Sequence, residues 1–177
     1  LFARIKAVYD DREKLGLGVE QARLLEETYK DFVRGGAGLP PDKQARFRAI
    51  NEELAVLTVK FGENVLKENN AFELVIDQEE GLAGLPPAVV AGAAETAKER
   101  GKASGWVFTL QRPSIIPFLQ YSEKRELREK IFKAYINRGN NGNALDNKAN
   151  AARIAALRVE RANLLGYPTH ADYVLEE

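Results

Sequence analysis

The stretch DKQARFRAINEELAVLTVKFGENVLKEN, residues 42–69, carries the longest regular pattern in the chain. Apolar residues recur along it three or four positions apart, at Phe47, Ile50, Leu54, Leu57, Phe61 and Val65. Since an α-helix places residues three and four apart on one face, this spacing predicts a single amphipathic helix. At 1.5 Å per residue the helix would be about 42 Å long. We expect a helix of that length to pack lengthwise against others.

Helical spacing also precedes this segment. Phe2, Ile5, Val8 and Tyr9 predict a first helix that runs to about Leu15 and stops at GLG. A second helix follows with Ala22, Leu25, Tyr29 and Phe32 on one face, and RGGAG at residues 34–38 ends it. Residues 1–70 are therefore predicted to form three helices.

The pattern then changes to short runs of β-branched and aromatic residues. AFELVID (residues 71–77) and GWVFTLQ (residues 105–111) predict two strands, at about residues 72–76 and 106–110. Between them, LPPAVVAGAAETAKERG predicts a helix with prolines at its start and Gly101 at its end. We expect the two strands to pair, in a direction that the sequence leaves open.

The last third of the chain is predicted to be a bend followed by helices. RPSIIPFLQYS (residues 112–122) is expected to bend, because its two prolines interrupt a helix. Ser122 is expected to cap a helix through about Asn137 whose buried residues are Leu127, Ile131, Ala134 and Tyr135. An alanine-rich helix is predicted over residues 145–165, and Thr169 with Asp172 forms a capping box for one more.

The predicted fold class is mostly α, a bundle of long helices with a small two-stranded β element. The chain is expected to be a single helical portion of a larger protein. It divides into three helices (1–70), strand, helix and strand (71–111), and the bend with its following helices (112–177). Both ends read as the interior of a helix, and neither carries a start or stop signal.

Composition excludes several classes of function. Lys and Arg number 26, and so do Asp and Glu, so the net charge is zero and no nucleic-acid or membrane partner is expected. The chain has no cysteine, which excludes disulfides and thiolate metal sites and favours a reducing, cytoplasmic location. No signal peptide is visible, and the uncharged stretches are too short to span a bilayer.

His170, in YPTHADYVLEE at residues 167–177, is the only histidine. A zinc site needs three or four ligands, commonly two histidines at helical spacing or a cysteine cluster. No HExxH motif is present to supply them. We therefore predict that His170 is an exposed first-turn residue with an orienting or interface role, and not a metal ligand.

The other candidate sites have plainer interpretations. RGNNGN (residues 138–143) lacks the Lys-Ser/Thr of a phosphate loop and is interpreted as a helix stop. Glu160 interrupts a possible basic face on the last long helix, which favours a solvated or interdomain surface formed by Arg153, Arg158 and Arg161. The pair Glu26 and Glu27 is expected to be solvated, and Trp106 with Phe108 to lie in the core.

A resemblance extends this interpretation. LLGYPTHADYVLEE (164–177), KAYINRGNNGNALDN (133–147) and WVFTLQRPSIIPFLQYS (106–122) resemble the peptidyl-dipeptidase and thimet-oligopeptidase family of zinc metallopeptidases, nearest to its bacterial peptidyl-dipeptidases. The stretch from Leu24 to Leu66 is also similar to the helical region that precedes these motifs. The resemblance therefore covers nearly the whole chain.

The resemblance implies a two-lobed helical enzyme with a deep channel that admits short peptides. The family's HExxH helix and third zinc ligand lie beyond the THADYVL motif, so no catalytic, metal or substrate-binding residue is assigned here. The expectation is a non-catalytic wall of the channel in a zinc enzyme that releases C-terminal dipeptides, with the catalytic lobe as its partner. The chain itself is expected to bind no zinc and to be inactive, and self-association through its end helices is possible. The alternative is a non-enzymatic helical scaffold or interaction module.

Overall fold

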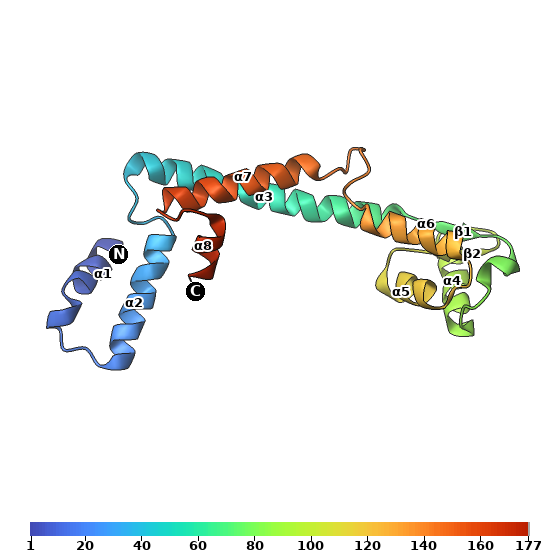
Figure 1. Ribbon diagram of the computed structural model, residues 1–177, viewed down its shortest axis with the longest axis horizontal. Helices are drawn as coiled ribbons and strands as arrows, with labels where there is room; N and C mark the ends of the chain where they lie inside the picture. The colour runs from blue at the N-terminus through green and yellow to red at the C-terminus, as the bar shows by residue number, and fades with distance from the viewer. Residues whose placement is uncertain (177) are drawn as a thin grey trace. The chain divides into compact units, whose positions relative to one another are not determined.

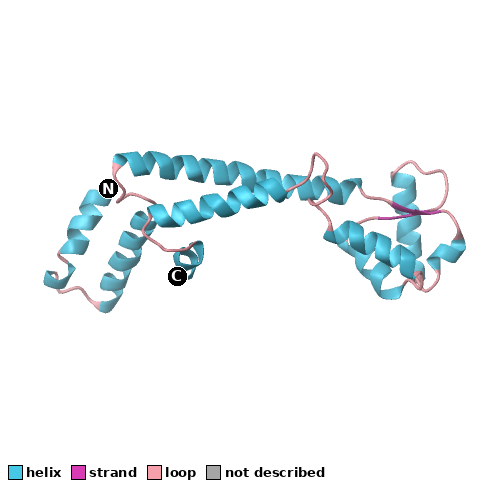
Figure 2. Ribbon diagram, turned by 45° about the horizontal axis from the view of Figure 1, so that its top comes forward, coloured by secondary structure: helices cyan, strands magenta, loops and turns pink. Residues whose placement is uncertain are grey.

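The computed structural model describes residues 1–176 of the chain. These residues form eight α-helices and one two-stranded antiparallel sheet, which confirms the predicted fold class (Figures 1 and 2). The chain divides into two compact units, which are described separately. One comprises Leu1–Thr58 and the residues from Ala152 onward, and the other comprises Val59–Ala151.

The first unit begins with two helices joined by residues 11–18. α1 (Phe2–Asp10) packs on α2 (Val19–Arg34) through stacked rings, with the Tyr9 and Tyr29 centroids 3.8 Å apart. The prediction that the first helix reaches Leu15 is wrong, because a 3₁₀ turn covers Arg12–Lys14. The aspartates at the end of α1 explain this, since their side chains favour caps and turns over a helix interior. The side chain of Asp11 accepts from Lys14 at 2.7 Å.

The rest of the first unit is built on α3 (Pro41–Ala71) and α7 (Lys148–Leu164). In this unit α7 lies along the first part of α3, as Figures 1 and 2 show. Ile50, Leu54 and Leu157 form the buried contact between them. The predicted long helix is confirmed, and its 31 residues correspond to about 46 Å. α7 starts three residues later than predicted, at Lys148 instead of Leu145.

The second unit holds the sheet. β1 (Leu74–Ile76) pairs antiparallel with β2 (Trp106–Phe108), in the register Leu74↔Phe108 and Ile76↔Trp106. A 3₁₀ turn at Glu79–Leu82 and the helix α4 (Pro87–Glu99) connect the two strands. Phe108 is fully buried, and its ring lies 4.6 Å from that of Phe118 between centroids. The predicted paired strands, with Phe108 in the core, are therefore confirmed.

The predicted bend at residues 112–122 is wrong: α5 (Arg112–Tyr121) is a continuous helix. Pro113 lies in the first turn, where a missing N–H costs nothing. Pro117 removes only the hydrogen bond that its N–H would have made to the carbonyl of Pro113, which a ten-residue helix with buried Ile115 and Phe118 tolerates.

Ser122 is not the predicted helix cap. It ends α5, and α6 (Arg125–Ile136) begins after Lys124. The Ser122 hydroxyl accepts from the Lys124 N–H at 3.2 Å, so it stabilises the turn between the two helices. Ile131 of α6 is fully buried, and Leu127, Ala134 and Tyr135 pack against the same core, as predicted.

α3 changes its buried face as it enters the second unit. Phe61, a predicted core position, is 39% exposed, while Asn64 and Glu68 are buried. The apolar stripe thus gives way to a polar one.

Within residues 1–176, no helix is long and apolar enough to cross a membrane.

Candidate functional site

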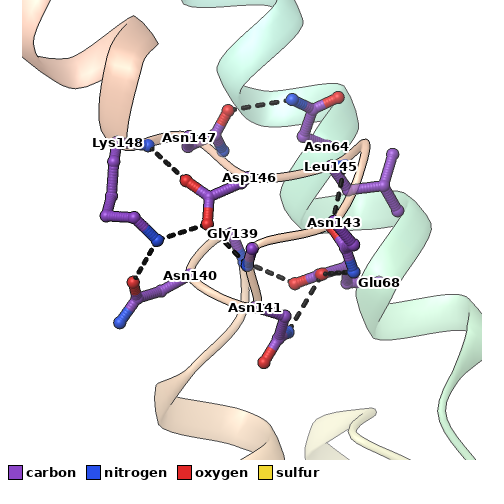
Figure 3. Close-up of polar contacts among 11 residues, drawn as sticks. Asn64, Glu68, Gly139, Asn140, Asn141, Asn143, Leu145, Asp146, Asn147 and Lys148 are labelled. Carbon is purple, nitrogen blue, oxygen red and sulfur yellow. Dashed lines mark hydrogen bonds and ion pairs between the residues drawn. The ribbon is translucent and has the colours of Figure 1, made fainter.

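The buried carboxylate of Glu68 lies against an asparagine-rich loop, residues 137–147, here called the asparagine loop (Figure 3). Three N–H groups of this loop donate to the carboxylate. The Gly139 backbone N–H donates to Oε2 at 2.5 Å, and the side-chain amides of Asn141 and Asn143 donate to Oε1 at 2.9 and 2.8 Å. Glu68 is only 8% exposed, so these donors replace nearly all of its hydration.

Asn147 fixes the far end of the asparagine loop to α3. Its Oδ1 accepts from Asn64 at 3.0 Å and from Asn150 at 2.9 Å, and its Nδ2 donates to the Phe61 carbonyl at 3.0 Å. Its backbone N–H donates to the Gly139 carbonyl at 2.7 Å, which closes the loop. Every polar side-chain atom of this buried asparagine therefore has a partner, as the low dielectric of an interior requires.

Gly139 and Gly142 have left-handed backbones, with φ of +73° and +65°. Gly139 is also closely packed, since a Cβ there would lie 2.9 Å from Nδ2 of Asn147. A larger residue at position 139 would therefore be strained and would displace Asn147. This pair of glycines lets the short loop turn its N–H groups toward α3.

A second carboxylate, Asp146, holds the start of α7. Its oxygens accept from the backbone N–H groups of Gly142 at 2.8 Å and Lys148 at 2.9 Å, and from the Lys148 ammonium group. The Lys148 ammonium also donates to Asn140 at 2.8 Å. The hydrogen bond from the Lys148 side chain is the main reason that the pKa of Asp146 falls to about 2.

Glu68 is charged at neutral pH despite its burial. Burial is the largest influence and raises its pKa, but the hydrogen bonds from Asn141, Gly139 and Asn143 together outweigh it. The net result is a pKa below the ordinary value of 4.5. No ion pair within residues 1–176 includes Glu68, so neutral N–H dipoles alone stabilise the charge.

His170 is the first residue of α8 (His170–Leu175), and the predicted capping box is confirmed. The Asp172 N–H donates to the Thr169 hydroxyl at 3.1 Å, and the Thr169 N–H donates to the Asp172 carboxylate at 3.0 Å. The predicted exposure of His170 is wrong, because the ring is half-buried 6.2 Å from that of Tyr173 and its Nδ1 is buried without a hydrogen-bond partner.

The environment of His170 favours the neutral imidazole. Its pKa is lowered, first by burial and then by the positive charges of Arg158 and Arg161. No carboxylate of residues 1–176 accepts from the ring to orient it, as is usual for a general base or metal ligand. Among residues 1–176, no three His, Cys, Asp or Glu side chains gather in a way that could hold a metal ion. The donor set of these residues therefore does not fit zinc.

Several of the remaining charged candidates form ion pairs. Arg23 contacts both Glu26 and Glu27, which are solvated as predicted. On α7, Arg153 pairs with Glu53 at 2.6 Å, and Glu160 pairs with Arg46 at 2.5 Å. The arginines of α7 therefore do not form a continuous basic face; Arg161 donates to Asn51 and lies against the ring of Tyr173.

α5 and α6 border a groove of about 480 Å³. Its floor is apolar, with Phe132 48% exposed and Ile136 55% exposed. The charged residues on its rim are Arg125, Arg128, Glu129 and Lys133. Lys133 pairs with Glu129, and Arg128 donates to the Ser122 carbonyl. The rim carries a net charge of about +2 (three basic groups and one acidic group), so it suits a ligand with an apolar group and a carboxylate.

Comparison with known proteins connects these features to a class. Residues 118–177 match the model of peptidase family M3. The chain is 36% identical over all of its length to the Dipeptidyl carboxypeptidase of Escherichia coli (strain K12), of which it covers 26%. It is 35% identical over 99% of its length to Oligopeptidase A of Haemophilus influenzae, of which it also covers 26%. The Arabidopsis thaliana protein Organellar oligopeptidase A, chloroplastic/mitochondrial, is 34% identical over 97% of this chain, which covers 22% of it.

The chain is therefore a homologue of peptidases over nearly its whole length. Residues 118–177 match the model of peptidase family M3, and the preceding residues align with the same relatives. The resemblance seen in the sequence is confirmed. The chain spans about a quarter of the length of the curated relatives it matches.

Proposed function

We propose that this chain is a non-catalytic helical part of a cytoplasmic, zinc-dependent peptidase that removes dipeptides from the C-terminus of short peptides. The observation that supports this most is the 36% identity, over the full chain, to a protein named Dipeptidyl carboxypeptidase. In this proposal the zinc and its ligands come from outside the 177 residues. The chain's own residues bind and position the peptide and take no part in bond cleavage.

The groove on α5 and α6 is our candidate for the channel wall. All of its lining residues lie within residues 118–177, which match the family model. Phe132 and Ile136 would contact an apolar side chain of the peptide. A free C-terminal carboxylate would be attracted to Arg125, which makes no ion pair within the described chain, and to the Arg128 guanidinium. Binding of a free terminal carboxylate would distinguish an enzyme that releases C-terminal dipeptides from one that cleaves peptides internally.

The test uses the longer protein that contains this chain, with N-terminally blocked reporter peptides that end in a free carboxylate or in an amide. We expect mass spectrometry to show dipeptides released from the free-carboxylate peptides only, and a chelator to stop the reaction until zinc is restored. The 177-residue chain alone should release nothing above buffer. Internal cleavage of both peptides would overturn the dipeptidase assignment, and no hydrolysis at all would favour the scaffold alternative.

The role of the groove is tested separately in the same protein. Arg125→Ala and Phe132→Ala should raise KM for free-carboxylate peptides and leave kcat nearly unchanged, because they remove binding common to the ground and transition states. Lys130→Ala is the matched control, since Lys130 is exposed on the same helix but outside the groove. Unchanged KM in both groove variants would remove the groove from the proposed channel wall.

A further inference from the structure

The asparagine loop gathers N–H donors around one point. Gly139 supplies a backbone N–H, and Asn141 and Asn143 supply side-chain amides. Figure 3 shows all of them converging on the carboxylate of Glu68, which comes from a separate element, α3. Successive backbone and side-chain N–H groups arranged in a concave loop are typical of anion-binding sites. The sequence RGNNGN is interpreted above as a helix stop, and the structure shows that its N–H groups bind the chain's own carboxylate.

The surroundings identify the class of anion. Oε1 accepts from two amides while Oε2 accepts from the backbone N–H, so both oxygens of a planar carboxylate are used. Asn143 is fixed in this orientation, because its Oδ1 accepts from the Leu145 N–H at 2.8 Å and its Nδ2 is thereby directed at Glu68. The nearby Asp146 is already bonded to Gly142 and Lys148.

We propose that Gly139, Asn141 and Asn143 form a carboxylate receptor, and that its occupation by Glu68 keeps the asparagine loop in its observed conformation. The inference does not depend on the proposed peptidase role, since it rests only on contacts within residues 59–151. Its physical basis is that removing the anion leaves the buried Gly139 N–H without an acceptor and takes away the common partner that holds the more exposed Asn141 and Asn143 amides against α3. An empty receptor is therefore expected to open.

The chemistry of truncation offers a direct test. Glu68→Ala removes the Cγ atom and the carboxyl group, which are the atoms of one acetate ion. The variant therefore has a cavity of acetate size lined by the three N–H donors. Acetate added to this variant should bind in the cavity and restore the hydrogen bonds that the substitution removes. Chloride at equal ionic strength is a single spherical ion without carboxylate oxygens and should not.

The experiment measures amide hydrogen exchange of residues 139–147 in the 177-residue chain at neutral pH. In Glu68→Ala we expect loop exchange to be faster by about tenfold to a hundredfold in chloride, and to slow again in acetate. Trp106 fluorescence confirms that the unit is folded, because Trp106 packs against its core. Glu63→Ala is the matched control: its carboxylate is exposed on the same helix, pairs with Lys67, and should give wild-type loop exchange in both salts.

A second variant covers the case in which Glu68→Ala does not fold. Glu68→Gln fills the site but offers one acceptor oxygen and directs an NH₂ group at the donors. We expect faster loop exchange in this variant and no recovery in acetate, because the amide occupies the receptor. Wild-type loop exchange in Glu68→Gln, or an equal response of Glu68→Ala to acetate and chloride, would show that the loop needs no carboxylate and would overturn the proposal.

Discussion

α3 is held to later parts of the chain by two contacts of opposite character. In the first unit Ile50 and Leu54 meet Leu157 in an apolar contact, and exposed Arg–Glu pairs flank it. In the second unit the buried Glu68 receives three N–H donors from the asparagine loop. The apolar contact is non-directional and tolerates small shifts, whereas the polar one requires every donor to be in place.

The carboxylates in the two contacts are neutralised differently. Glu53 and Glu160 have side chains 37% and 40% exposed, and each binds an arginine through both oxygens. Glu68 is buried and binds no cation within the described residues. Burying an arginine beside it would cost the desolvation of a second ion, while backbone and amide N–H groups cost much less. Neutral N–H donors from a short loop therefore stabilise this one buried anion with a smaller desolvation cost than a buried cation would have.

The largest effect is expected from the apolar contact. Leu157→Ala removes a fully buried side chain and leaves a cavity between α7 and α3. We expect the free energy of unfolding to fall by about 2–5 kcal/mol. Urea denaturation followed by far-UV circular dichroism measures this loss.

The matched control is Val159→Ala, on the same helix but 47% exposed. Its loss should be well below that of Leu157→Ala, because much of the removed surface already faces water. Equal losses in the two variants would mean that the buried contact of Leu157 does not hold α7 against α3.

The next effect is expected from Glu68→Gln, which keeps the size of the side chain and removes its charge. The three hydrogen bonds that the charged carboxylate accepts are weakened or lost, so the free energy of unfolding should fall by about 1–3 kcal/mol at pH 7. Urea unfolding followed by Trp106 fluorescence reports on the unit that contains Glu68. Glu63→Gln, at an exposed carboxylate of the same helix, should change little.

The pH dependence of that difference follows from the lowered pKa of Glu68. Since the folded pKa lies below the ordinary value of 4.5, the stabilisation is fully present above about pH 4.5 and is lost as the pH falls through the folded pKa. The stability difference between wild type and Glu68→Gln should therefore be constant near neutrality and shrink in acid. If the stability difference between wild type and Glu68→Gln grew as the pH fell, the pKa of Glu68 would be raised in the folded state and not lowered.

Periodicity in the sequence predicted most of the fold, because the burial of apolar side chains determines where most of the helices and strands form. The Phe47, Ile50 and Leu54 stripe, the β-branched strands and the Thr169 capping box all rest on local patterns, and the structure confirms them. The bend at residues 112–122 was wrong because two prolines four positions apart cost one backbone hydrogen bond, and the buried Phe118 offsets that loss. Tertiary packing overrode a local rule there.

The Glu68 site was missed because its partners are more than 70 positions away. One local signal existed. Continuing the three- and four-residue spacing of the α3 stripe beyond Val65 reaches Glu68, so a charged residue stands where an apolar one is expected. The glycines and asparagines of residues 138–143 were a second signal, interpreted as a helix stop. Only the structure brings the two together.

The smallest effect is expected from the exposed ion pair, and it separates the two kinds of carboxylate by salt. Glu53→Gln breaks the bidentate contact with Arg153, in which Nε and Nη2 lie 2.6 and 2.8 Å from the two carboxylate oxygens. Exposed pairs contribute little because water and the entropy of two long side chains oppose them. We therefore expect a small loss of stability at low salt, below that of Glu68→Gln, and none at about 1 M sodium chloride, where the Debye length is about 3 Å. The loss in Glu68→Gln should persist at that salt, because its hydrogen bonds are buried and involve no second ion. Urea unfolding of both variants at low and high salt makes the comparison, and the same salt dependence in both would mean that Glu68 is stabilised as an ordinary surface charge.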